Sequence, residues 1–201
     1  MVTTPFTRWI IPLIHFLKMY AFDSSKQMLT LILETINGKP LTLSSIDRFV
    51  SDSKNGKDAF KSNYLYPLSS IFGITDKTVK PFKAHWVMLS KDVLGGADLV
   101  NGTRNKNFAT QEKLVKEAGF EIPNLIDTVV SVFLHNLETG DFVYPDKSSV
   151  HQCTFTRVQE RNSRGHQIVV GNFSALGLKV SLIADEYDFL GASCAMKSID
   201  T

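Results

Sequence analysis

The C-terminal part of the chain changes from helical to strand-like spacing, and this change restricts the fold more than any other feature. Short runs rich in β-branched and aromatic residues follow one another as HQCTFTRVQE, HQIVVGNF, GLKVSLIA and YDFLGASCAMKSI. Turn-forming residues separate these runs at Gly165, at residues 175–177 and at residues 185–186. Four successive strands predict an antiparallel C-terminal β-meander, and the helices before it predict an α+β fold with helices packed on one face.

The clearest single element is the apolar helix expected in the segment PNLIDTVVSVFLHNLETG. Asn124 precedes this helix as an N-cap, Asp127 follows three residues later as in a capping box, and Gly140 ends the helix. Phe133 lies in the middle of a broad apolar face. We therefore expect this helix to be central and almost fully buried.

The N-terminal half predicts a strand, a tight turn, a helix and a second strand. Within residues 26–43, three leucines at 29, 31 and 33 alternate with Thr30 and Ile32, as in a strand. Asn37 and Gly38 follow, a pair typical of hairpin turns. A short helix is expected to follow, with Ser44 or Ser45 as its N-cap. Residues 83–93 predict another strand.

An apolar run, RWIIPLIHFLKMY, occupies residues 8–20. Pro12 and His15 interrupt it, no clear cleavage site follows it, and it is too short to span a bilayer. We expect residues 1–25 to form an apolar arm or helix that docks on the body or on a partner, and residues 26–201 to form one α+β domain. A signal peptide, or contact of residues 8–20 with a membrane surface, is the alternative.

The balance of charge excludes a dedicated nucleic-acid binder. Lys and Arg number 22 against 20 Asp and Glu, a formal charge of +2, whereas nucleic-acid-binding domains are strongly basic. The two cysteines, Cys153 and Cys194, are too few for a disulfide framework. Free thiols are favoured over a single disulfide bridge. Free thiols in turn favour a soluble protein in a reducing compartment.

A loop over residues 94–106 leads into an expected amphipathic helix with Asn107 as its N-cap and Gly119 as its stop. A helix N-terminus attracts anions, and cations beside it would complete a carboxylate or phosphate site. The candidate anion-binding residues are Thr103, Arg104, Lys106 and Arg157. The alternative is an internal ion pair between Arg104 and a carboxylate such as Asp92, which would pin the loop.

The sequence offers little that resembles a catalytic centre. His151 and Cys153 lie two apart on an expected strand and are the only candidates for a nucleophilic pair, although a core thiol beside a histidine is the commoner arrangement. His135 and Glu138 read as a polar pair at a helix end, and residues 185–188 as a solvated acidic turn. No phosphate-binding, dinucleotide-binding or nucleophile-elbow motif occurs, and we expect no metal and no cofactor.

Six segments occur in a fixed order: TINGKPLTL, HWVMLSKDV, GTRNKNFATQEKLVKEAGFEIP, TFTRVQE, IVVGNFSALGL and YDFLGASCAMK. Together, over roughly residues 27–199, they resemble an uncharacterised module of amoeba-associated chlamydia-like bacteria that often follows F-box-like or leucine-rich-repeat segments. The chain departs from that pattern at Cys153 and Phe155, where the module has Trp and Tyr, and at Asn172, where it has Gly. The resemblance implies no particular reaction and no catalytic residue.

These observations favour a non-enzymatic protein-interaction or structural module that acts through its apolar N-terminal arm and a sheet edge. Its expected partner is another protein or further copies of the same chain. One alternative is a secreted effector or enzyme with an anion-binding cleft between the 94–106 loop and the C-terminal sheet. Another is a component of a larger assembly such as a shell.

Overall fold

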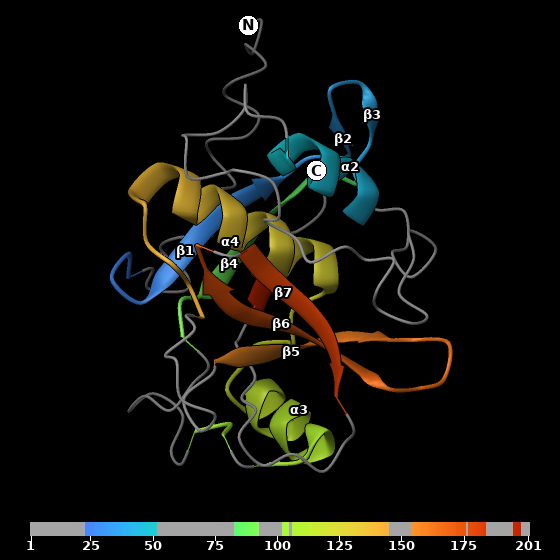
Figure 1. Cartoon of the computed structure of the whole chain (residues 1–201). Helices are drawn as coiled ribbons and strands as arrows, with labels where there is room; N and C mark the ends of the chain where they lie inside the picture. The colour runs from blue at the N-terminus through green and yellow to red at the C-terminus, as the bar shows by residue number, and fades with distance from the viewer. Residues whose placement is uncertain are drawn as a thin grey trace, which may run out of the picture.

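The computed structural model describes residues 23–51, 83–92, 102–104, 106–144, 154–175, 177–183 and 195–197. Its central element is helix α4 (Leu125–Thr139), which packs against strands of two three-stranded sheets (Figure 1). The predicted α+β class with an antiparallel C-terminal meander is confirmed. No helix in these ranges is long and apolar enough to cross a membrane.

The C-terminal sheet contains β5 (Phe155–Arg161), β6 (Gln167–Ser174) and β7 (Gly177–Ile183), each antiparallel to the next. The fourth predicted strand is present as β8, but its predicted place in the meander is wrong. Strand β8 (Ala195–Lys197) pairs instead with β4 (His85–Ser90) in the other sheet. Alternation of polarity identifies a strand and its faces, but it does not identify the strand's partner.

The second sheet has the order β1-β4-β8, and β1 (Gln27–Ile32) runs antiparallel to β4. Among the strands that the structure describes, β1 is therefore at the edge of this sheet. A small hairpin of β2 (Thr35–Ile36) and β3 (Lys39–Pro40) follows. Asn37 and Gly38 form its turn with φ angles of 50° and 73°, which confirms the predicted hairpin.

The caps predicted for two helices are confirmed. The side chain of Asn107 accepts a hydrogen bond from the backbone N–H of Thr110 at the start of α3 (Phe108–Glu117), at 2.9 Å. The side chain of Asn124 accepts one from the backbone N–H of Asp127 at the start of α4, at 2.7 Å. Gly140 ends α4 in the left-handed conformation, with a φ of 82°.

Helix α2 (Leu43–Ser51) starts earlier than predicted, so the assignment of Ser44 or Ser45 as its N-cap is wrong. Thr42 is the cap: its hydroxyl accepts from the backbone N–H of Ser45 at 3.1 Å. In return, the Ser45 hydroxyl accepts from the backbone N–H of Thr42 at 2.8 Å. Thr caps helices nearly as well as Ser does, so composition alone leaves the starting residue open.

A β-bulge in β6 brings an additional aromatic ring to the core. The pairing of β6 with β7 changes register between Gly171 and Ser174, and Asn172 adopts a φ of 53°. Val170 and Phe173, three residues apart, consequently belong to the same buried cluster, whereas a regular strand would place them on opposite faces. The Phe173 ring meets Phe133 of α4 edge to face, with 5.6 Å between ring centroids.

Candidate functional site: a groove along strand β1

Arg157, one of the predicted anion-binding residues, is buried beneath the start of α3. It is 1% exposed, and its Nη1 donates to the carbonyl of Lys106 at 3.2 Å and to Oε1 of Gln111 at 3.0 Å. Gln111 in turn donates from Nε2 to the carbonyl of Thr103 at 2.7 Å. The structure thus gathers Thr103, Lys106 and Arg157, and Arg157 of β5 holds this segment through the Lys106 carbonyl and the side chain of Gln111.

Arg104 faces Asp92, the carboxylate that the sequence predicted as its internal partner. The Nη2 to Oδ1 distance is 3.6 Å, and the two side chains are 39% and 76% exposed. The pair is confirmed, but exposed ion pairs of this kind stabilise a fold only weakly because water and salt screen them. Binding of an anion by these four residues stays a prediction.

Arg104→Ala is therefore expected to lower the free energy of unfolding by less than ~1 kcal/mol. Arg157→Met should cost more, ~1–3 kcal/mol, because it removes hydrogen bonds from buried acceptors. Urea denaturation of both variants and the wild type checks the order. A larger loss for Arg104→Ala would mean that the Asp92 pair, and not Arg157, holds this part of the chain.

Several other predictions fall outside the described residues. They concern the nucleophile candidates His151 and Cys153, the second thiol Cys194, the apolar run at residues 8–20 and the acidic turn at residues 185–188. Within the described ranges, no three His, Cys, Asp or Glu side chains gather in a way that could hold a metal ion.

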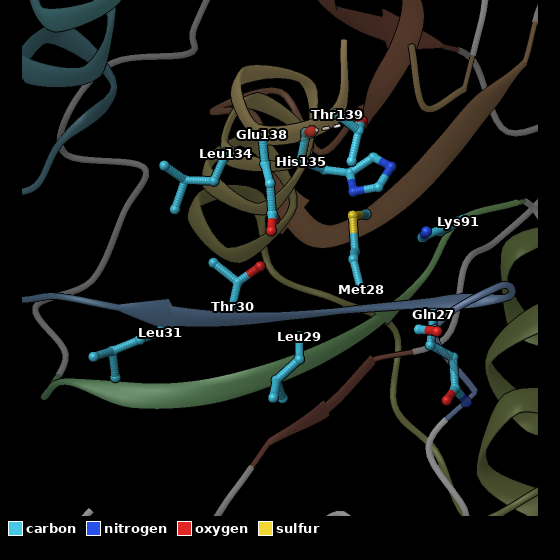
Figure 2. A pocket seen from close by; sticks show the side chains of 11 residues that line it. Gln27, Met28, Leu29, Thr30, Leu31, Lys91, Leu134, His135, Glu138 and Thr139 are labelled. Carbon is cyan, nitrogen blue, oxygen red and sulfur yellow. Dashed lines mark hydrogen bonds between the residues drawn. The ribbon is translucent and has the colours of Figure 1, made fainter. Parts of the chain in front are cut away.

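A pocket of about 490 Å³ lies between β1 and the C-terminal half of α4 (Figure 2). Met28 and Thr30 point from β1 toward α4, whereas Leu29 and Leu31 point to the other side of the strand. Polar residues of β1, of α4 and of the segments before β1 and after β4 also line this pocket. They are Ser24, Gln27, Thr30, Lys91, His135, Glu138 and Thr139.

His135 is the most deeply buried titratable group of this pocket, with 9% of its surface exposed. Burial lowers its pKa, and the nearby Lys91 cation lowers it further, while Asp141 and Glu138 oppose this shift. Burial and the Lys91 cation both favour the neutral form of the imidazole. It hydrogen-bonds to no described residue, and Figure 2 shows it over Met28, facing the pocket. The interpretation of His135 and Glu138 as a simple helix-end pair missed this cavity.

A second pocket, of about 230 Å³, continues the first one along β1 and is apolar. It lies between α2, α4 and the β2–β3 hairpin, and both pockets include Leu31 and Leu134 in their walls. Leu33 and Leu134 stand at its rim with 52% and 43% of their surfaces exposed. We call the two pockets together the β1 groove, with a polar half and an apolar half.

A buried histidine–aspartate pair fixes α4 over the sheet. His85 Nε2 lies 3.0 Å from Oδ1 of Asp127, and His85 Nδ1 lies 2.7 Å from the carbonyl oxygen of Lys83. The Lys83 carbonyl can only accept, so Nδ1 carries a proton, and Nε2 is joined to the Asp127 carboxyl group by the second hydrogen bond. The pair joins β4 to the first turn of α4.

The position of His85 opposite Asp127 could not be anticipated because 42 residues separate them. The β1 groove was missed for the same reason, since its walls come from distant parts of the chain. No family model matches the chain, and neither the curated proteins nor the solved structures compared with it gave a match.

Proposed function

We propose that this domain is a protein-interaction module whose β1 groove binds an extended, apolar segment of a partner protein. The observation that carries the proposal is an edge strand beside a continuous groove. Among the described strands β1 pairs only with β4, and the apolar half of the groove runs beside it. An extended peptide can add to such an edge through main-chain hydrogen bonds while its side chains enter the groove.

The lining of the groove suits a peptide better than a small polar ligand. The apolar half is formed by Leu, Ile, Val and Phe side chains, which favour bulky aliphatic or aromatic residues. The polar half mixes donors and acceptors, including Gln27, Thr30 and Thr139. A peptide backbone presents N–H and C=O groups in alternation, and such a mixed lining can satisfy both.

The apolar run at residues 8–20 is a second contact in this proposal. It joins the described chain at the end where Ser24 lines the polar half of the groove. Its length and apolar character suit a docking arm that adds to the surface contacted by the partner. The alternative proposal, an effector with an anion-binding cleft, gains less support because Arg157 already donates to internal acceptors.

Selection from a peptide-display library against the purified full chain tests the proposal. We expect enrichment of sequences with large apolar residues at alternating positions, as an added strand requires. Leu134→Asp should weaken binding of a selected peptide at least ~10-fold, which corresponds to ~1.4 kcal/mol. Phe142→Asp is the matched control, because Phe142 is similarly exposed, at 38%, and lines neither pocket.

Three outcomes would contradict the proposal. They are no enrichment of any apolar pattern, equal loss of binding in both variants, or selected peptides that still bind Leu134→Asp at full strength. Light scattering adds a further check. A dimer that Leu134→Asp dissociates would show that a second copy of the chain, and not a separate partner, occupies the groove.

A further inference from the structure

We propose that Lys91 and His135 bind a carboxylate carried by the peptide in the β1 groove. This inference rests on the proposed function and specifies the partner: an apolar extended segment with a carboxylate at the polar end. The two side chains belong to different elements, since Lys91 directly follows β4 and His135 lies near the end of α4. Both line the same pocket (Figure 2).

The imidazole of His135 supplies the observation that points to a ligand. It is buried over nine-tenths of its surface, faces the pocket and hydrogen-bonds to no described residue. Its ring nitrogens are not among the fully buried side-chain atoms without a partner, so they are open to the pocket, where a ligand can replace water as their hydrogen-bond partner. A neutral imidazole offers one N–H donor, and the Lys91 ammonium offers up to three. A carboxylate, which only accepts, can receive bonds from both.

The other charges of the pocket define where the carboxylate would lie. Figure 2 shows Glu138 above Thr30, on the other side of His135 from Lys91. Glu138 therefore repels an anion from the middle of the groove and leaves the Lys91 end as the favoured position. Asp141 follows α4 and also acts on His135, whereas Gln27 and Met28 of β1 carry no charge.

Carboxylate binding should be coupled to protonation of His135. Lys91 now disfavours the imidazolium, and a bound carboxylate would offset that effect and raise the pKa of His135. By linkage, binding then takes up protons and becomes tighter as the pH falls through the pKa that His135 has in the complex. Asp141 and Glu138 are present with and without ligand, so they act on the pKa of His135 in both the free and the bound protein.

The test uses 4-methylpentanoate as the probe and 4-methylpentanamide as its uncharged analogue, at constant ionic strength. The ring signals of His135 are followed by NMR and assigned from their loss in His135→Asn. We expect the carboxylate to shift these signals and raise the pKa of His135, while the amide does neither. Lys91→Gln should weaken carboxylate binding at least tenfold. Lys113→Gln, a control at an exposed lysine of α3, should bind as the wild type does.

Equal shifts with both probes, or undiminished binding by Lys91→Gln, would overturn the inference. Selected peptides ending in a carboxylate are then compared with amidated ones, with and without a terminal Glu, to separate a C-terminus from an acidic side chain. Peptides that bind through Leu134 regardless of any carboxylate would refute this inference and leave the proposed function standing. Small carboxylates that bind while no peptide does would refute the proposed function.

Discussion

Replacing Phe133 by Ala is expected to lower the free energy of unfolding by ~3–5 kcal/mol, the usual cost of deleting a buried Phe. Phe133 is 3% exposed, belongs to the main core cluster and packs edge to face on Phe173. Because α4 joins the two sheets, a cavity at this position loosens both. Urea denaturation followed by circular dichroism measures the loss.

Leu134→Ala is the control for Phe133→Ala. It changes the next residue of the same helix, but Leu134 is 43% exposed, so the expected loss is below ~1 kcal/mol. Equal losses for the two variants would mean that helix propensity, and not packing between the sheets, determines the effect. An unchanged stability of Phe133→Ala would show that α4 is not the centre of the fold.

The second large effect is expected for Asp127→Ala. Its carboxyl group is fully buried and hydrogen-bonds to His85, which is itself 5% exposed. Removal of this group leaves the buried Nε2 of His85 without its hydrogen-bond partner, which typically costs ~1–3 kcal/mol. The free energy of unfolding measured in urea should show this loss, and α4 should loosen over β4.

A double-mutant cycle separates the pair from the individual side chains. His85→Ala combined with Asp127→Ala should cost clearly less than the sum of the two single losses, because neither buried polar group is then left without its partner. Glu117→Ala is the control, since that carboxylate is exposed on α3 and should not couple to His85. Additive losses in the His85 and Asp127 cycle would refute a stabilising contact between these two side chains.

The parts of the fold that could be predicted from sequence depend on interactions between near neighbours in the chain. The side chains of Asn107 and Asn124 cap their helices by accepting from the backbone N–H three residues ahead. Asn37 and Gly38 form a two-residue turn. Such signals specify the local conformation by themselves. The N-cap of α2 shows the limit of such signals, since it is Thr42 where Ser44 or Ser45 was predicted. Neighbouring residues of equal capping ability cannot be ranked without the packing of the helix.

The parts that could not be predicted depend on contacts between distant residues. Strand β8 has three residues, too few to indicate that it pairs with β4 and not with β7. In the sequence, the bulge at Asn172 is indicated only by one residue type that tolerates positive φ within an otherwise regular strand pattern. Its consequence, the burial of Phe173 against α4, requires the tertiary structure.

In the candidate site too, contacts between near neighbours in the chain could be predicted and contacts between distant residues could not. Sequence proximity grouped Arg104 with Thr103 and Lys106, but the structure turns Arg104 toward Asp92 and assigns the buried contacts to Arg157. The β1 groove has no sequence signature, because its polar half combines side chains from β1, from the end of β4 and from α4. A histidine on a mostly apolar helix was the only local indication.

Hydrogen exchange measured with and without a selected peptide tests the central claim most directly. If the peptide adds a strand at the β1 groove, protection should increase in β1 and in the C-terminal half of α4, with little change in β5, β6 and β7. Protection at residues 102–111 instead, around the start of α3, would contradict this account and favour the anion-binding cleft beside Arg157.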